Sequence, residues 1–179
     1  IYYDIANEII KKNKAYVCFC NHERIKELRA KGIPCEHREQ ENNLEYFQSL
    51  IYGEMKGVLR IKTDIKHPDP SVRDWIAFRI IDPKYIHPRI EKIEKLLGFK
   101  PFLWPTYNFS VAVDDHLLGI SHVFRAKEHL INTIKQSYIY EILNWKKPEY
   151  IHYGRLKLEK FILSKSEIKK GITEGKYLG

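Results

Sequence analysis

The stretch from Gly119 to Leu163, "GISHVFRAKEHLINTIKQSYIYEILNWKKPEYIHYGRLKLEKFIL", decides the fold. Residues 119–124 are a short apolar run that predicts a buried strand, and the alternation over 150–163 predicts a second strand. Between them, residues 127–145 predict a long helix, whose apolar face we expect to hold Leu130, Ile131, Ile134, Tyr138, Ile142 and Leu143. A strand, a helix and a strand in this order predict a parallel sheet that binds ligands at the carboxyl ends of its strands.

Shorter helices and strands are expected along the rest of the chain. In the second of the expected helices, Asn21 is a candidate N-cap and Gly32 a candidate C-terminal stop. "YNFSVAVDDHLLG" (107–119) stays open, because its alternation suits a strand and its length suits a helix. The patterns predict helices at 2–13, 21–31, 42–55 and 89–98, and strands at 15–19, 57–64 and 75–82.

The charge balance favours a polyanionic partner. The 179 residues carry 31 Lys and Arg against 23 Asp and Glu, a formal net charge of +8. A solvated basic surface would have the same composition. No apolar run approaches the roughly 18 residues of a membrane span, and the N-terminus lacks the apolar stretch of a signal peptide, so we expect a cytoplasmic protein. The chain lacks an initial Met, and we expect it to be a piece of a larger protein.

All three cysteines lie in one short segment. Cys18 and Cys20 come before the helix expected at 21–31, and Cys35 and His37 follow it. A helix that returns the chain would bring these two pairs together as the four ligands of a structural zinc site. The alternative is three buried free thiols and a surface histidine, whereas a disulfide is disfavoured in a reducing compartment.

Two further groups could carry chemistry. Asp114 and Asp115 are adjacent and therefore point in different directions, so we expect at least one to be a cap or an ion-pair partner. Arg125 ends the strand expected at 119–124, where its guanidinium could bind a carboxylate or phosphate through two hydrogen bonds. A surface arginine is the simpler alternative.

Several motifs together resemble one family. "WPTYNFSVAVDDHLLGISHVFRAKEHL" and "YGRLKLEKFILSKSEIKKGI" resemble the catalytic core of the archaeal and eukaryotic glutamyl-tRNA synthetases, which are class I aminoacyl-tRNA synthetases. "LSKS" is similar to the KMSKS signature loop. "CFC" and "CEH" are similar to a CxC and CxH zinc knuckle in the inserted acceptor-stem-binding domain of such enzymes.

The resemblance implies an α/β fold in two parts. Residues 1–100 would form a mixed α/β acceptor-stem-binding insertion with its leading core helix, including the zinc knuckle at 18–37. Residues 101–179 would form the second half of a class I Rossmann-like catalytic fold. The implied activity is that of a glutamate-tRNA ligase, which activates glutamate with ATP and Mg²⁺ and transfers it to the tRNA 3′ end.

The resemblance also implies roles for individual residues. Lys165, with Ser164 and Ser166, would be catalytic, and Arg155 and Lys165 would bind ATP. Tyr107, Arg125 and His129 would bind glutamate, and a cation at Arg125 favours glutamate over glutamine. Arg73 and Lys62 are the candidates for contacts with the phosphates of the tRNA acceptor stem. The zinc ligands would be Cys18, Cys20, Cys35 and His37.

The sequence departs from the family pattern in three places. The HIGH motif is absent, Ile162 replaces the first lysine of KMSKS, and residues 87–105 depart from the shorter segment expected there. Without the HIGH half, we expect this chain alone to be inactive. The alternatives are therefore a zinc-stapled module that binds the tRNA acceptor stem without catalysis, and a glutaminyl-type relative.

Overall fold

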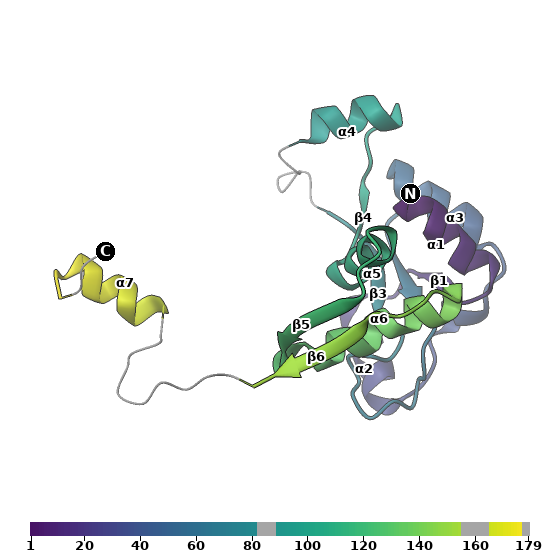
Figure 1. The fold of residues 1–179 in the computed structure, drawn as a ribbon. Coiled ribbons are helices and arrows are strands. Elements are labelled where there is room, and N and C mark those ends of the chain that lie inside the picture. The colour runs from purple at the N-terminus through teal and green to yellow at the C-terminus, as the bar shows by residue number, and fades with distance from the viewer. Residues whose placement is uncertain (82–88, 155–164, 177–179) are drawn as a thin grey trace.

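The computed structural model describes residues 1–81, 89–154 and 165–176. Helices and strands alternate along most of the chain (Figure 1). In chain order they are α1 (Tyr2–Lys11), β1 (Ala15–Cys18), α2 (His22–Lys31), the 3-10 turn η1 (Glu36–Glu39), α3 (Asn43–Tyr52), β2 (Val58–Ile61), β3 (Ile76–Ile80), α4 (Ile90–Leu97), β4 (Leu103–Pro105), α5 (Tyr107–Leu117), β5 (His122–Ala126), the 3-10 turn η3 (Lys127–His129), α6 (Leu130–Leu143), β6 (Glu149–Tyr153) and α7 (Lys165–Thr173).

An antiparallel sheet with the order β1-β2-β3-β4 forms the centre of the molecule. Its register pairs Ala15 with Ile61, Leu59 with Phe78 and Ile80 with Leu103. Helices α1, α3, α5 and α6 contribute to one hydrophobic core against this sheet. The helices and strands expected before residue 100 are all present, although several are shorter than expected.

Strand β1 is buried on both faces and separates two clusters of side chains. Ala15 and Val17 belong to the main core, whereas Tyr16 and Cys18 pack with α2 in a second cluster. This division follows from the two-residue period of a strand, which directs successive side chains to opposite faces. The second cluster contains Cys18 and Cys35, so the pleat of β1 directs the Cys18 side chain to the face opposite the main core.

The expected ends of α2 are confirmed. The side chain of Asn21 accepts a hydrogen bond from the backbone N–H of Arg24 at 2.8 Å, as an N-cap does. Gly32 lies in the left-handed region with φ of 62°. A side chain there would be strained and would also meet the carbonyl oxygen of Ile65. The segment between the two cysteine pairs is therefore a helix with defined ends.

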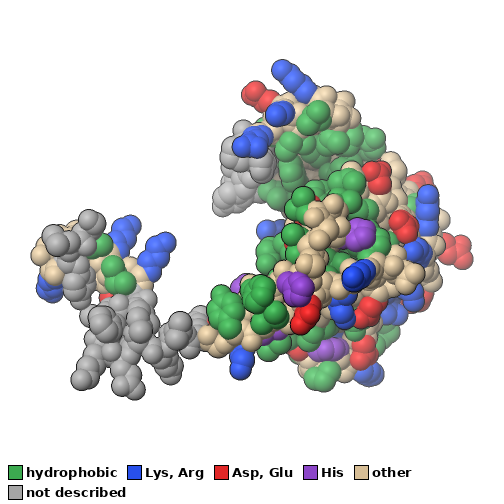
Figure 2. Space-filling view, in the orientation of Figure 1, with side chains coloured by type: hydrophobic (Ala, Val, Ile, Leu, Met, Phe, Trp, Pro, Cys, Tyr) green, Lys and Arg blue, Asp and Glu red, His purple; other side chains and the backbone are tan. Residues whose placement is uncertain are grey.

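The strand-helix-strand order expected after residue 119 is confirmed. Of the second strand expected at 150–163, β6 covers the start and ends at Tyr153, and residues 155–163 lie outside the described ranges. Strands β5 and β6 pair in parallel, with Phe124 opposite Ile151, and α6 connects them. The expectation that residues 119–124 form a buried strand was wrong, because Phe124 is 67% exposed. Within the described ranges β5 pairs only with β6, and hydrophobic side chains reach the surface over this pair (Figure 2).

Helix α6 is buried along a different face from the one expected. Its buried residues are Gln136, Ile139, Tyr140 and Leu143, while Leu130 is exposed. They keep the helical spacing, but the stripe is rotated around the helix because α6 packs against α5 and turns a polar residue, Gln136, inward. Residues 107–119, for which the sequence pattern suited both a strand and a helix, contain helix α5, and this helix provides that packing surface.

The proposed boundary at residue 100 stays a prediction. Strand β4 lies after this boundary and completes the sheet that begins before it. The hydroxyl of Tyr3 donates to the carbonyl oxygen of Leu103 at 2.6 Å, and the core is continuous from α1 to α6. Among the helices in the described ranges, none has the length and apolar character of a membrane span.

We expect the free energy of unfolding to depend on the aromatic contacts at the centre of the sheet. Phe47 is fully buried, and its ring centroid lies 5.5 Å from that of Phe78. Phe47→Ala should lower the free energy of unfolding by about 3 to 5 kcal/mol, because a large cavity remains in the core. Urea unfolding measures this value. The matched control Phe124→Ala should cost less than about 0.5 kcal/mol, because its ring is already exposed.

Candidate functional site

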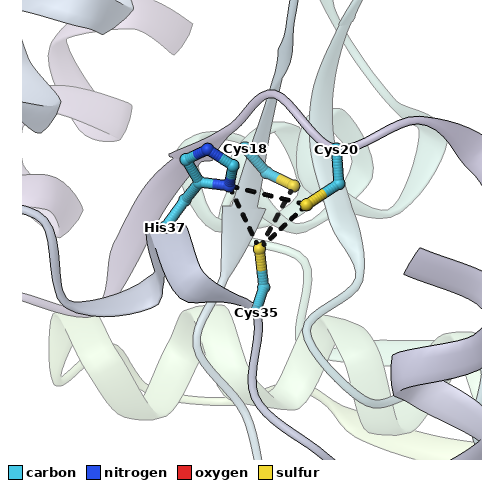
Figure 3. A group of neighbouring side chains, drawn as sticks. All are labelled: Cys18, Cys20, Cys35 and His37. Carbon is cyan, nitrogen blue, oxygen red and sulfur yellow. Dashed lines mark hydrogen bonds between the residues drawn. The ribbon is translucent and has the colours of Figure 1, made fainter. Parts of the chain in front are cut away.

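Four metal-ligating side chains converge behind β1. Cys18, Cys20, Cys35 and His37 point toward one another (Figure 3), and their ligand atoms all lie within 4.8 Å of one another. The Sγ atom of Cys35 is 3.7 Å from that of Cys18, 3.3 Å from that of Cys20 and 3.3 Å from Nδ1 of His37. The prediction that the two pairs meet after the α2 turn is confirmed, and these residues could hold a metal ion.

The pKa values of the three cysteines in the cluster are shifted in different directions. A hydrogen bond with the Cys35 thiol, assisted by the nearby Arg60 guanidinium, lowers the pKa of Cys18 to about 5 despite its burial. The same hydrogen bond and burial raise the pKa of Cys35, and burial raises that of Cys20. Cys18 is therefore the thiol that loses its proton most readily, and a bound cation would favour the thiolate form of all three, since metals bind the deprotonated form.

A buried carboxylate positions the turn that carries His37. Asp74 is 1% exposed, and its carboxylate accepts hydrogen bonds from Nε of Arg38 at 2.9 Å, the hydroxyl of Tyr16 at 3.0 Å and the backbone N–H of Thr63 at 2.9 Å. Arg38 follows His37 directly in η1. The carboxylate therefore fastens η1 to β1 and to the segment after β2.

The three residues expected to bind an amino acid lie around one cavity. Tyr107, Arg125 and His129 line a cavity of about 340 Å³ between α5, β5 and η3. Tyr107 begins α5 and is exposed, whereas Arg125 lies near the carboxyl end of β5. Residues from three elements are therefore brought together here, at the end of a parallel strand where α/β proteins bind ligands.

Arg125 is buried and incompletely paired. It is 8% exposed, its Nη1 donates to Oε1 of Gln136 at 2.9 Å, and its guanidinium carbon lies 4.5 Å from the centroid of the Tyr150 ring. Its Nε and Nη2 atoms are buried and have no hydrogen-bond partner among the residues that the structure describes. Unpaired buried N–H groups are unfavourable, so a ligand that accepts hydrogen bonds from them would be stabilised.

The two adjacent aspartates have different surroundings. Asp114 accepts a hydrogen bond from the hydroxyl of Tyr2 at 2.7 Å, which links α5 to α1. Asp115 lines the cavity of Arg125, and burial raises its pKa while the guanidinium opposes that effect. The two carboxylates therefore do not act as one pair, in agreement with the expectation that at least one has a structural partner.

The remaining predicted site residues are dispersed or lie outside the described ranges. Ser164 and Arg155 fall in residues 155–164, which the structure does not describe. Lys165 and Ser166 open helix α7 rather than lying in a loop, and α7 lies apart from the sheet in Figure 1.

The two proposed tRNA contacts have partners within the chain. The Nε atom of Arg73 donates to the carbonyl of His67, and Nη1 donates to carbonyls at the end of α2. The side chain of Lys62 is only 7% exposed, and its Nζ donates to Asn13 and Glu39. Their role as tRNA contacts stays a prediction, because these intrachain bonds use many of their donors.

Sequence analysis did not identify two buried polar residues that complete these sites, Asp74 and Gln136. Asp74 lies in the turn-rich segment before β3, and Gln136 lies within a helix whose other residues suggested a hydrophobic face. A polar residue inside an apolar helical pattern was the only available signal for Gln136. Their partners are distant in sequence, so only the fold brings them together.

A parallel strand-helix-strand unit within a mixed α/β chain is typical of Rossmann-like α/β proteins. Sequence comparison specifies its family. The chain belongs to the tRNA synthetases class I (E and Q), catalytic domain, a family that matches residues 1–179.

Curated relatives are similar over the whole chain. The glutamate–tRNA ligase of Pyrococcus horikoshii is 52% identical over 184 residues, and that of Methanocaldococcus jannaschii is 48% identical over 182 residues. Each alignment covers 100% of this chain and 31% of the relative. The chain therefore spans about a third of the length of these relatives.

Solved structures support the fold. A glutamate tRNA ligase from Elizabethkingia meningosepticum, crystallised in complex with its amino acid, superposes with a TM-score of 0.57 at 20% sequence identity. The match covers 94% of this chain and 35% of that chain. A glutamate-tRNA synthetase from Elizabethkingia anophelis gives 0.52 at 22% identity over 94% of this chain and 36% of that chain. The chain therefore has a class I synthetase catalytic-domain fold.

We expect the Asp74 carboxylate to be essential for the stability of the segment around the metal-ligating cluster. Asp74→Asn removes the charge that pairs with Arg38 and should lower the free energy of unfolding by about 3 to 5 kcal/mol, as for other broken buried ion pairs. Urea unfolding measures the loss. Glu39→Gln is the control, because Glu39 pairs with Arg38 and Lys62 at the surface and should cost about 1 kcal/mol or less. Equal losses in both variants would contradict the role of Asp74.

Proposed function

We propose that the protein to which these residues belong is a glutamate–tRNA ligase, which activates glutamate with ATP and transfers it to the 3′ end of tRNA. The family covers the whole chain, and the curated relatives at about 50% identity carry this name. Because the chain spans about a third of their length, the complete reaction is a property we assign to the whole protein.

The observation that carries this proposal is the guanidinium of Arg125. Two of its N–H groups are buried without partners at the cavity that Tyr107 and His129 also line. A carboxylate accepts hydrogen bonds and carries the opposite charge, so it fits this position better than the neutral amide of glutamine. Glutamate has a carboxylate at each end of its carbon chain, and Arg125 would bind one of them.

We assign a structural Zn²⁺ ion to the four-ligand cluster. Tetrahedral coordination with Zn–S bonds of about 2.3 Å requires sulfur atoms about 3.8 Å apart. The distances of 3.7 Å and 3.3 Å from the Cys35 sulfur to the other two sulfurs are close to this value. Three thiolates and one imidazole would complete the coordination shell of zinc, so the ion would stabilise the segment rather than activate water.

ATP with Mg²⁺ would be bound through the signature segment around Lys165. Lys165 opens α7, and a helix N-terminus favours phosphate oxygens because its first N–H groups lack partners within the helix. A lysine there would stabilise negative charge on the transferring phosphates, and no protein nucleophile is needed for such catalysis. Ser164, Ser166 and Arg155 would support this role, as the family resemblance implies.

The tRNA acceptor stem is the proposed partner of residues 15–85. The basic charge of the chain suits recognition of the phosphates and sugars of an A-form helix. Arg73 and Lys62 remain candidates for this contact, although binding would require part of their intrachain bonding to be exchanged for phosphate oxygens.

We expect Arg125→Cys to weaken the use of glutamate far more than the use of ATP. The loss of a charge-assisted pair with a desolvated carboxylate should cost on the order of 2 to 5 kcal/mol in kcat/KM for glutamate. ATP–pyrophosphate exchange by the natural protein that contains this chain measures it. Arg79→Cys is the control, because Arg79 is exposed on β3. Unchanged glutamate kinetics in a folded Arg125→Cys protein would assign this residue a purely structural role.

We expect one zinc ion per chain in protein purified without chelators, measured by elemental analysis. Cys35→Ala and His37→Ala should each lower the zinc content and increase hydrogen exchange in residues 15–40, because the binding free energy of a structural zinc contributes to folding. Residues of α6 should retain their protection. The control His22→Ala removes a nearby exposed histidine that is outside the cluster, and it should keep the metal. Metal-free wild-type protein would overturn the assignment.

A further inference from the structure

A chain of polar side chains connects Arg125 to His129 through the interface between α5 and α6. Nη1 of Arg125 donates to Oε1 of Gln136 at 2.9 Å, and Nε2 of Gln136 donates to Oδ1 of Asn108 at 3.2 Å. Nδ2 of Asn108 donates to Oδ1 of Asn132 at 3.1 Å, and Nδ2 of Asn132 lies 3.0 Å from Nδ1 of His129. These hydrogen bonds form an unbroken series, and the residues at its two ends, Arg125 and His129, line the same cavity.

The direction of every hydrogen bond in this chain follows from Arg125. A guanidinium only donates, so the atom of Gln136 that it contacts must be the amide oxygen. The amide nitrogen of Gln136 must then face Asn108, whose contacting atom must be oxygen. The same reasoning applied to Asn108 and Asn132 leaves an N–H group of Asn132 facing the ring of His129.

We propose that Gln136, Asn108 and Asn132 form a hydrogen-bond relay from Arg125 to His129. These three positioning residues fix His129 as the neutral tautomer with its proton on Nε2. Nδ1 of His129 must accept the hydrogen bond from Asn132, since a proton on Nδ1 would place two donors against each other. The series therefore leaves unpaired N–H groups at both ends, the buried Nε and Nη2 of Arg125 and Nε2 of His129, on two residues that line the same cavity.

The substrate selectivity that this arrangement implies deepens the proposed function and rests on it. A carboxylate accepts hydrogen bonds from N–H groups at both ends of the relay, whereas the amide of glutamine would turn a donor toward at least one of them. Other polar groups lie around the same cavity or beside the series. Tyr107, Asp115 and His122 line the same cavity, and the neighbouring Thr133 contacts His152 on β6. The relay would thus add to the selection of glutamate over glutamine.

The most direct test is a substitution three side chains away from the histidine. Glu at position 136 can accept from Arg125 but cannot donate to Asn108, so both asparagine amides must reverse. Gln136→Glu should therefore move the ring proton of His129 from Nε2 to Nδ1. The ¹⁵N shifts of histidine-labelled natural protein report the tautomer, with His129→Gln used to assign the signal. The control Gln48→Glu changes the same group on the exposed side of α3 and should leave the ring unchanged.

A second variant keeps the test decisive if Gln136→Glu fails to fold. Asn132→Asp leaves the bond between Arg125 and Gln136 intact but can only accept from His129, so the proton should again lie on Nδ1. The exposed Asn42→Asp is its control. A wild-type ring already protonated on Nδ1, or a ring that remains protonated only on Nε2 in the folded variants, would overturn the relay.

Kinetics of the natural protein separate the relay from the proposed function. In Gln136→Glu, the ratio of kcat/KM for glutamate to that for glutamine should fall by about tenfold or more, mainly through KM for glutamate. If the tautomer changes as expected but glutamate is not a substrate even of the wild-type protein, the relay stands and the proposed function falls. If glutamate is activated and the tautomer does not change, the relay falls and the function stands.

Discussion

The buried carboxylate of Asp74 is the constraint on which the first half of the structure depends. A carboxylate that is 1% exposed has lost its hydration, and this loss is offset only when donors surround it. Here Tyr16, Arg38 and Thr63 supply those donors from three separate segments. Burial and this carboxylate raise the pKa of Tyr16, so its hydroxyl stays protonated and keeps donating. The backbone of Asp74 has φ of 41°, a conformation that persists only where surrounding contacts enforce it.

Asp74 also connects the sheet to the metal-ligating cluster, through its backbone carbonyl as well as its carboxylate. Arg60 donates through Nη1 to the carbonyl oxygen of Asp74 at 2.9 Å, and the same guanidinium helps to lower the pKa of Cys18. Arg38, which pairs with the carboxylate, follows His37 in η1. Charged groups next to the cluster therefore help to position its sulfur and nitrogen ligand atoms. The positions of these atoms do not depend on the short turn η1 alone.

The sequence predicted the parts of the molecule that local rules determine. The caps at Asn21 and Gly32 and the convergence of the four cysteine and histidine ligands follow from residue types and spacing within the 20 residues from Cys18 to His37. The strand-helix-strand order was also predictable, because its hydrophobic periods are distinct. The buried face of α6 and the exposure of Phe124 were not predictable, since they depend on which surfaces pack against each element. Gln136 was missed for the same reason, because its partners, Arg125 and Asn108, lie 11 and 28 positions away.

The metal-ligating cluster and the cavity of Arg125 are connected through one hydrophobic core, and this determines how they influence each other. Helix α1 packs in the main core, while Tyr2 and Tyr3 bond to Asp114 in α5 and to Leu103 in β4. A displacement of α5 at the cavity of Arg125 would therefore act on the same core against which β1 packs, and β1 carries Cys18. Packed cores transmit displacement because they contain few voids that could absorb it. A structural metal in the cluster would then stiffen the sheet against which α5 packs, so the cluster would influence the shape of the cavity at Arg125 without lining it.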